Sequence, residues 1–324
     1  MPTQLAEQPD LVADIGGTNA RFALVHAGHA PHAERTLPCA EYPDVLSAAR
    51  AYLTEFGAAP RRACLAVATP IIGDHVAFTN SPWQFSIEAT RDALQLERLL
   101  LINDFTAQAW ALPLLTAADL YKVGRGRQVP GAPMGVVGPG TGLGVSGLVA
   151  NGKHWVALQG EGGHASFSPA NEFEANVLRA VWRQFPHVSC ERLISGVGLP
   201  YLYSAVAALE GRLGEAPTAA AITDAALAGT DPLCRTVLDT FCAMLGTVAG
   251  NLALMLGARG GIYIAGGIVP RLGDFFAQSP FRERFEAKGR YQTYLSEIPT
   301  YVILSKSSAL LGAAWALHNA GPQH

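Results

Sequence analysis

The stretch Leu11–Val25, LVADIGGTNARFALV, decides the fold. Leu11–Ile15 is strand-like, Gly16–Asn19 has the residues of a tight turn, and Arg21–Val25 resumes a strand. Strand residues on both sides of such a turn predict a β-hairpin with a glycine-rich tip.

The same layout occurs again at Met134–Val149, MGVVGPGTGLGVSGLV. Each copy has an apolar strand, a glycine-rich turn with a Gly-Thr pair, and a second apolar strand, and Thr18 and Thr141 lie 123 residues apart. That spacing is far longer than the period of a solenoid repeat. The chain of 324 residues is also about twice the length of an average domain. We therefore expect two similar α/β domains.

Hydrophobic periodicity and turn residues predict the other elements. The expected strands are 63–68, 98–102 and 261–265. The expected helical segments are 45–56, 88–96, 105–115, 172–185, several up to 258, and 307–318. The Gly-, Arg- and Pro-containing stretch Val123–Pro133 is the best linker candidate.

Phe241–Ala258 is an uncharged, apolar run that contains Gly246-x-x-x-Gly250, the spacing of membrane helix dimers. A single membrane span fits poorly with two α/β halves around it. We predict a buried core helix whose small residues let it lie close to a sheet.

Composition excludes several classes of function. Hydrophobic residues make up 49% of the chain and charged residues 15%, which provides large cores and argues against intrinsic disorder. The net charge of −3 provides no basic surface, so neither nucleic acid nor a membrane is an expected partner. The 34 glycines suggest backbone that lies close to a ligand.

The five cysteines are scattered and include no C-x-x-C pair, so they indicate neither a disulfide framework nor a zinc ribbon. None lies in a cationic context that would activate a thiol. His26, His29 and His32 lie in a stretch that reads as a hairpin loop, which does not favour a metal cluster. The first ten residues, MPTQLAEQPD, lack the features of a secretory signal. These observations favour a cytoplasmic protein.

The two hairpin tips are suited to bind a polyphosphate. Backbone N–H groups of glycines can point at an anion, and threonine hydroxyls add donors. The sequence does not fit other nucleotide-binding motifs. No G-x-x-x-x-G-K-[ST] occurs. Gly142–Gly147 matches G-x-G-x-x-G, but a strand follows it where the dinucleotide motif needs a helix. We interpret the tips as sites for nucleotide phosphates, although a glycine-rich hairpin can also be only a tight turn.

Asp104 follows the apolar strand Leu99–Ile102 and precedes a helix, which is where α/β sheets place ligands. An aspartate that only caps the helix would occupy the same position. Position alone leaves a ligand and an N-cap equally open.

Glu161 and His164 are separated by two glycines, so they cannot both be core residues of a regular element. We expect them to converge on one polar ligand; the alternative is a structural histidine in a turn. Metal binding lacks further ligands at helical spacing. Glu191 begins a helical stretch and by itself reads as a partner of the helix dipole.

Five motifs occur in a fixed order: ADIGGTNAR (13–21), INDFTA (102–107), GPGTGLG (138–144), GEGGH (160–164) and IAGGIVPR (264–271). Together they resemble bacterial glucokinases of the proteobacterial type, in the hexokinase–actin ATPase superfamily, over essentially the whole chain. Relatives often have Gly where Ala13 stands and Ala where Pro139 stands. Neither departure removes a functional side chain.

The resemblance implies a two-domain actin-like ATPase fold, also called ribonuclease H-like, with the active site in the interdomain cleft. The smaller α/β domain would comprise residues 1–114 plus 305–324 and the larger one residues 115–304. The implied activity is phosphorylation of glucose to glucose 6-phosphate, with ATP and Mg²⁺ as cofactors. The clustered cysteines of zinc-containing sugar kinases are missing, so no zinc is expected. A cytoplasmic homodimer is the implied assembly.

The resemblance also implies the residue roles, with Asp104 as the general base and Asp14 near Mg²⁺ and its waters. The implied sugar ligands are Asn103, Asp104, Glu161, His164 and Glu191. The implied nucleotide site consists of Ala13, Asp14, Ile15, Gly16, Gly17, Thr18, Gly138, Gly140, Thr141, Gly142, Gly266 and Gly267.

Two alternatives stay open. The first is a kinase for another hexose, such as fructose, mannose or an N-acetylated hexosamine, which a panel of substrates would distinguish. The second is a non-catalytic, sugar-sensing regulator. Such regulators usually carry a helix-turn-helix domain before the first phosphate loop, whereas only thirteen residues precede Asp14 and no basic stripe substitutes.

Overall fold

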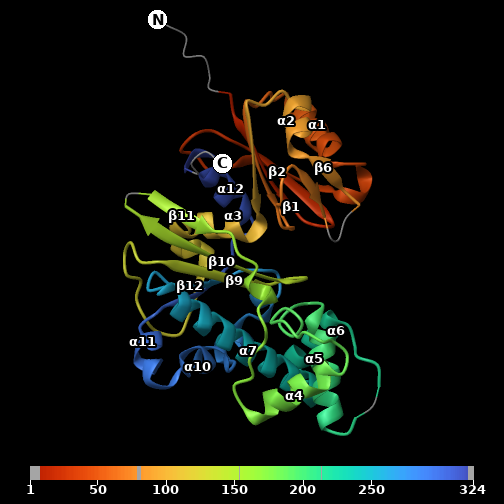
Figure 1. Cartoon of the computed structure of the whole chain (residues 1–324), viewed down its shortest axis with the longest axis vertical. Coiled ribbons are helices and arrows are strands. Elements are labelled where there is room, and N and C mark those ends of the chain that lie inside the picture. The colour runs from red at the N-terminus through yellow and green to blue at the C-terminus, as the bar shows by residue number, and fades with distance from the viewer. Residues whose placement is uncertain (1–7, 79–81, 153, 213, 320–324) are drawn as a thin grey trace, which may run out of the picture. The chain divides into compact units, whose positions relative to one another are not determined.

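The computed structural model describes residues 8–78, 82–152, 154–212 and 214–319 (Figure 1). The chain forms two compact units. Unit 1 comprises Met1–Leu115, Asn151–Gln159 and Ser305–His324, and unit 2 comprises Thr116–Ala150 and Gly160–Leu304. Residues 1–7 and 320–324, which the sequence assigned to the smaller domain, lie outside the described residues.

One segment differs from the expected domain division. The sequence placed residues 151–159 in the larger domain, but they belong to unit 1. The reason is tertiary: β11 (His154–Leu158) contacts α3 (Asp104–Ala111), a helix of unit 1. No local sequence signal reports that contact.

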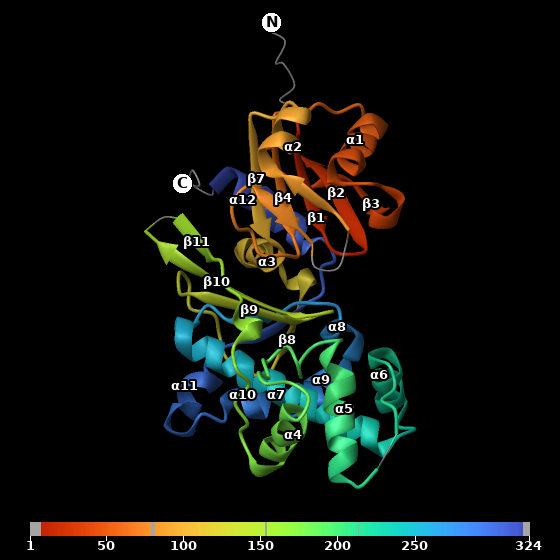
Figure 2. The ribbon, with the colours of Figure 1, turned by 45° about the vertical axis from the view of Figure 1, so that its right-hand side comes forward.

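Unit 1 is built on a five-stranded sheet in the order β3-β2-β1-β4-β7 (Figure 2). The predicted hairpin is β1 and β2, which pair antiparallel from Asp10 opposite Val25 to Ile15 opposite Ala20. β4 is parallel to β1, and β7 is parallel to β4. The strands are β1 (Asp10–Ile15), β2 (Asn19–Val25), β3 (His32–Pro38), β4 (Arg62–Val67) and β7 (Arg98–Asn103), with β5 (His75–Ala77) and β6 (Gln84–Ser86) paired separately.

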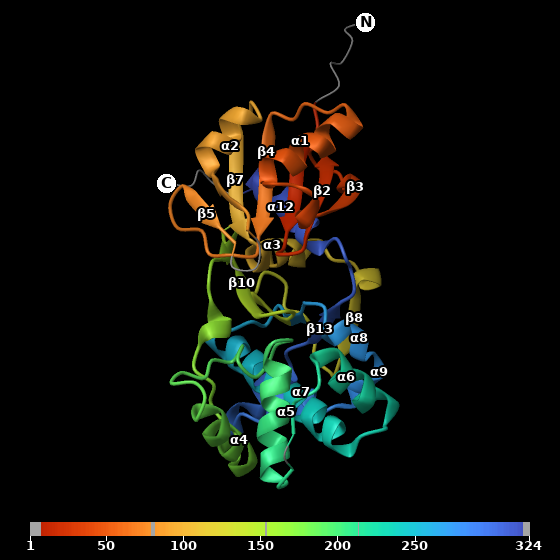
Figure 3. The same cartoon turned by 90° about the vertical axis from the view of Figure 1, so that its right-hand side faces the viewer.

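Helices cover both faces of this sheet. The helices are α1 (Val45–Phe56), α2 (Ile87–Ala93), α3 and α12 (Ser308–Asn319). Asp44 caps α1 by accepting the N–H of Ser47, and Gly57 ends it in the left-handed conformation, so local sequence fixes both ends. Figure 3 shows α12 behind the strands, where it packs on α3, β1 and β4.

Unit 2 contains the second sheet, in which its own strands have the order β10-β9-β12-β13-β8. The predicted second hairpin is β9 and β10, and β12 and β13 continue the sheet in parallel, as β4 and β7 do in unit 1. The internal repeat therefore extends from the hairpins to the order and direction of the neighbouring strands. The strands are β8 (Leu120–Val123), β9 (Met134–Pro139), β10 (Leu143–Asn151), β12 (Ile262–Ile264) and β13 (Thr300–Ile303).

Helices make up most of the rest of unit 2. They are α4 (Glu172–Trp182), α5 (Gly198–Leu209), α6 (Ala219–Ala228), α7 (Pro232–Leu256), α8 (Val269–Leu272), α9 (Asp274–Gln278), α10 (Phe281–Glu286) and α11 (Gln292–Ser296). Asp231 caps α7 and Pro232 occupies its first turn, while Gly257 ends it in the left-handed conformation.

By length and composition α7 is apolar enough to cross a membrane, yet most of it is buried inside unit 2. The prediction of a core helix is confirmed, and α7 also contacts β9 of the sheet, but its two spaced glycines face another element. A Cβ on Gly246 or Gly250 would lie 2.3 or 2.6 Å from the carbonyl oxygen of Phe281 or Phe285. The two glycines therefore admit the backbone of α10, not a sheet.

The linker prediction for Val123–Pro133 is also wrong, because this stretch lies inside unit 2. β8 ends at Val123, and the N–H groups of Arg127 and Val129 donate to the carbonyl oxygens of Glu297 (3.2 Å) and Arg259 (3.0 Å). The glycines and prolines of this stretch lie in an ordered segment without regular secondary structure.

Candidate active site

The predicted first phosphate loop is the tip of the β1–β2 hairpin in unit 1. The Gly16 N–H donates to the carbonyl oxygen of Asn19 (2.9 Å), which closes the turn. Gly16, Gly17 and Thr18 are at least partly exposed, whereas the side chains of Ala13 and Ile15 are fully buried. Ala13 and Ile15 therefore offer only backbone groups to a ligand, because strand side chains alternate between faces.

Asp14 is the one carboxylate of this loop. It is half-buried and lies opposite Arg21 in the β1–β2 ladder. Burial raises the pKa of Asp14, and the positive charge of Arg21 only partly offsets this. A desolvated carboxylate oxygen is a ligand that Mg²⁺ prefers, and a divalent cation would relieve the cost of its charge. The residue fits the implied metal.

The Asn103–Asp104 pair stands where β7 ends and α3 begins. Asn103 is the N-cap, because its Oδ1 accepts the N–H groups of Phe105 (2.9 Å) and Thr106 (3.3 Å). Asp104 is the first residue of the helix, and its Oδ1 accepts from Phe105 at 2.9 Å. The capping alternative for Asp104 is therefore wrong; its neighbour has that role.

The first phosphate loop and the Asn103–Asp104 pair lie at one edge of the sheet in unit 1. Val67 pairs with Ile15 on one side and with Asn103 on the other, so the ends of β1, β4 and β7 form one row. Adjacent strands are about 4.8 Å apart, which places the backbones of Ile15 and Asn103 about 10 Å from each other. A phosphate at the hairpin tip and a sugar at the end of β7 would be neighbours.

The predicted second phosphate loop is the tip of the β9–β10 hairpin in unit 2, where the Gly140 N–H donates to the carbonyl oxygen of Gly142 (2.8 Å). Gly140, Thr141 and Gly142 are at least partly exposed, and Gly138 is buried in β9. Gly266 lies directly against this hairpin: its φ is 82°, and a Cβ would stand 2.4 Å from the carbonyl oxygen of Pro139. Only glycine fits there.

Gly267 follows in open space and is exposed. The predicted adenosine motif and the second phosphate loop are thus adjacent within unit 2.

The predicted sugar ligands of unit 2 lie on two paired segments. The N–H of Glu191 donates to the carbonyl oxygen of Gly163 (2.9 Å), and Nδ1 of His164 lies 3.9 Å from Oε1 of Glu191. Glu161 and His164 are exposed, and Glu191 is half-buried. These side chains are accessible to a ligand.

Glu191 does not begin a helix. It lies in a series of turns, and α5 starts only at Gly198. Its Oε2 accepts the N–H of Leu143 (2.9 Å), so a sugar ligand predicted from the sequence touches the second phosphate loop. Sequence reasoning missed Gly163, where a Cβ would lie 1.9 Å from the carbonyl oxygen of Leu143. The adjacent pair of glycines at 162–163 was the available signal.

The cysteines give no sign of nucleophilic chemistry. All five are buried and free. Burial raises the pKa of each thiol, to about 11 for Cys190 and Cys234 and about 12 for Cys242. They remain protonated near neutral pH. Among the described residues, no group of three His, Cys, Asp or Glu side chains could hold a metal ion.

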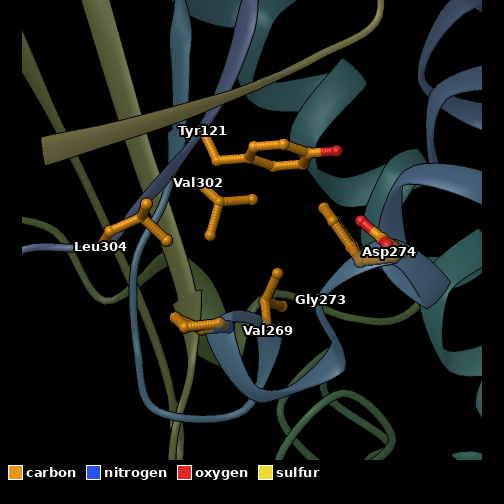
Figure 4. A pocket seen from close by; sticks show the side chains of 8 residues that line it. Tyr121, Val269, Gly273, Asp274, Val302 and Leu304 are labelled. Atoms are coloured by element: carbon orange, nitrogen blue, oxygen red, sulfur yellow. The ribbon is translucent and has the colours of Figure 1, made fainter. Parts of the chain in front are cut away.

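Unit 2 also contains a pocket of about 210 Å³ (Figure 4). One of its lining residues, Val269, lies two residues after Gly267 in the sequence. Its lining is largely hydrocarbon from Val269, Val302 and Leu304, with Tyr121 and Asp274 at its side. Its lining contains a carboxylate and no basic side chain, so it is not suited to bind phosphate.

Comparison with known proteins identifies the family. The Glucokinase family model matches residues 11–320. A glucokinase of Neisseria meningitidis is 53% identical over 319 residues, covering 98% of this chain and 97% of that protein. The crystal structure of a glucokinase from an Antarctic psychrotroph has a TM-score of 0.89 at 39% identity and covers 97% of this chain and 99% of that one.

A more distant structure, a ROK family glucokinase from Streptomyces griseus in complex with glucose and AMPPNP, has a TM-score of 0.63 at 17% identity, covering 96% of this chain and 99% of that one. At this identity the likeness concerns the fold alone. The fold and the family match define a sugar kinase with the two-domain actin-like ATPase fold. Within that class, the chain belongs to the glucokinase family.

Proposed function

We propose that this protein transfers the γ-phosphoryl group of ATP to the C6 hydroxyl of glucose, with Asp104 as the general base. Membership of the glucokinase family supports the reaction. The shared edge of β1 and β7 supports the residue roles, because it brings a phosphate loop and a carboxylate near each other. That juxtaposition is the observation that carries the proposal.

Asp104 accepts the proton of the sugar hydroxyl as the hydroxyl oxygen attacks the γ-phosphorus of ATP, and the bond from that phosphorus to the bridging oxygen breaks to release ADP. Asn103 orients the sugar with the nitrogen of its amide, since α3 already uses the amide oxygen. In phosphoryl transfer most of the catalysis is positioning and stabilisation of charge. The backbone N–H groups and threonine hydroxyls at both hairpin tips provide donors for the phosphates.

Mg²⁺, when bound, neutralises charge on the phosphates, and Asp14 is the residue that would hold it or its waters. Gly266 and Gly267 serve the adenosine part of ATP. Among the nucleotide residues, Ala13 and Ile15 contribute backbone only.

Glu161, His164 and Glu191 bind sugar hydroxyls. A hexose offers many O–H donors, so carboxylate and imidazole acceptors suit it. A sugar that lacks a matched hydroxyl leaves such a group unpaired and is rejected. Membership of the glucokinase family is the basis on which we propose glucose as the preferred hexose.

We further propose that the protein is a cytoplasmic homodimer without nucleic-acid or membrane partners. The family resemblance supports the dimer, and the net charge of −3 supports the absence of both polyanionic partners. Light scattering coupled to gel filtration over a concentration series tests the assembly; a monomer at all concentrations contradicts it.

A coupled assay of sugar phosphate formation tests the reaction. Glucose, fructose, mannose and N-acetylated hexosamines are compared at equal concentration, with ATP, ADP or polyphosphate as donor and with Mg²⁺ or EDTA. We expect the highest kcat/KM for glucose with ATP and Mg²⁺, and no turnover in the presence of EDTA. Preference for another hexose would redirect the proposal, and no turnover of any sugar would favour a regulator.

A further inference from the structure

The carboxylate of Glu191 accepts a hydrogen bond with one oxygen and lies near a histidine with the other. Its Oε2 accepts the N–H of Leu143 at 2.9 Å, at the start of β10. Its Oε1 lies 3.9 Å from Nδ1 of His164. One half-buried side chain thus joins the second phosphate loop to the proposed sugar ligands.

The segment that carries Glu191 contacts the same loop at its other end. The N–H of Gly196 donates to the carbonyl oxygen of Gly140 (2.8 Å), and the N–H of Val197 donates to that of Thr141 (3.3 Å). The loop is therefore held at two points, by backbone at 140–141 and by the Glu191 side chain at 143. The backbone contacts do not involve the Glu191 side chain.

Glycine makes these close approaches feasible. A Cβ on Gly142 would lie 2.4 Å from Oε2 of Glu191, and a Cβ on Gly163 would lie 1.9 Å from the carbonyl oxygen of Leu143. The first contact shows that the carboxylate lies against the loop, since any side chain at 142 would displace it. The second shows that the His164 segment packs on the same strand end.

From this geometry we propose that Glu191 is a positioning residue for the second phosphate loop, through which sugar binding and nucleotide binding are coupled. Sugar hydroxyls that donate to Oε1 fix the carboxylate in the orientation in which Oε2 holds Leu143. Ordering that is already achieved for one ligand lowers the cost of binding the other. Each substrate then tightens the other by the same factor. The coupling between the two substrates rests on the proposed function, whereas the hydrogen bond from Leu143 to Glu191 does not.

The test compares Glu191→Ala and Glu191→Gln with Glu161→Ala. Glutamine retains an oxygen that can accept from Leu143, whereas alanine does not. Glu161 is a matched control, because it is another proposed sugar ligand in the same unit. Calorimetry measures the Kd of Mg·AMPPNP without sugar and then at saturating glucose, and circular dichroism verifies folding.

Without sugar, Glu191→Ala should bind Mg·AMPPNP about 5–30-fold more weakly than the unmodified protein. Glu191→Gln and Glu161→Ala should bind it as the unmodified protein does. At saturating glucose, the tightening of Mg·AMPPNP should be retained in Glu161→Ala and lost in Glu191→Ala.

Equal sugar-free affinity in Glu191→Ala and the unmodified protein would overturn the proposal. Stronger binding in both Glu191 variants would overturn it too, since it would mean that the carboxylate only repels phosphate. The glucose Kd is a separate readout: if no variant changes it, the assignment of sugar ligands fails while the sugar-free nucleotide result still decides the role of Glu191 in the loop.

Discussion

Asn103 is predicted to have two separable roles, and a pair of substitutions distinguishes them. Its amide oxygen caps α3 through the N–H groups of Phe105 and Thr106, at 2.9 and 3.3 Å. The amide nitrogen is left for a sugar hydroxyl. Serine at this position keeps a capping oxygen but has no amide donor, and alanine has neither.

The magnitudes follow from these bonds. Loss of an N-cap costs about 0.5–2 kcal/mol, so Asn103→Ala should be about 1 kcal/mol less stable than Asn103→Ser. In a protein of this size that difference lowers Tm by roughly 2–4 °C. Loss of one hydrogen bond to the sugar costs about 1–3 kcal/mol, or about 5–150-fold in the KM for glucose, and should be similar in both variants. The KM for ATP should not change.

Thermal unfolding and steady-state kinetics on the two variants provide the test. A glucose KM in Asn103→Ser equal to that of the unmodified protein would refute the amide as a sugar ligand. Equal Tm values for the serine and alanine variants would refute the cap. Because the two readouts are independent, one role can fail while the other stands.

Three further predictions concern stability. Arg284 pairs at 2.6 Å with Glu174, whose side chain is 2% exposed. Arg284→Ala leaves that charge buried without its partner, so it should lower the free energy of unfolding in urea by about 3–5 kcal/mol. A decrease below about 1 kcal/mol would contradict this. A Cβ on Gly312 of α12 would lie 1.8 Å from the carbonyl oxygen of Ala107. Gly312→Ala should therefore lower the free energy of unfolding by at least about 1–3 kcal/mol. An unchanged urea midpoint would contradict this and would show that α12 can shift without cost. Burial raises the pKa of Asp14, so its neutral form stabilises the fold at low pH and this contribution is lost as pH rises through the raised pKa. Asp14→Asn should therefore raise Tm relative to the unmodified protein increasingly as the pH rises above about 4, the ordinary pKa of an aspartate. It should also abolish Mg²⁺-dependent turnover, and a Tm below that of the unmodified protein at neutral pH would contradict the prediction.

Local sequence signals located much of the fold because they act over a few residues. The turn glycines between Ile15 and Ala20 fixed the first hairpin, and Asp44 and Gly57 fixed both ends of α1. The internal repeat indicated two similar halves, and the strand orders agree with it. Elements without such signals were not found, among them β3, which is largely exposed, and the short helices α8–α11.

The features that sequence reasoning missed depend on tertiary contacts. The isolated bridge between Ser166 and Ser189 pairs the His164 and Glu191 segments, and two residues give no periodic pattern. Polar residues near Glu191 suggested a helix start, but Gly196 and Gly198 are used for close backbone contacts instead. The capping role was assigned between Asn103 and Asp104 only by side-chain geometry. Residue types in the sequence indicated which residues belong to the candidate site, whereas the role of each residue depends on the geometry of its side chain.

Turnover of Asp104→Asn tests the central claim most directly. Asn103 keeps α3 capped in this variant, and the new amide oxygen can still accept the Phe105 N–H, so the fold and the Mg·AMPPNP affinity should be retained. The amide cannot accept the hydroxyl proton, and loss of a general base typically costs about 10²–10⁴ in rate. We predict a kcat for glucose phosphorylation that is at least about a hundredfold lower. A kcat close to that of the unmodified protein would contradict the role of Asp104 and the proposed mechanism.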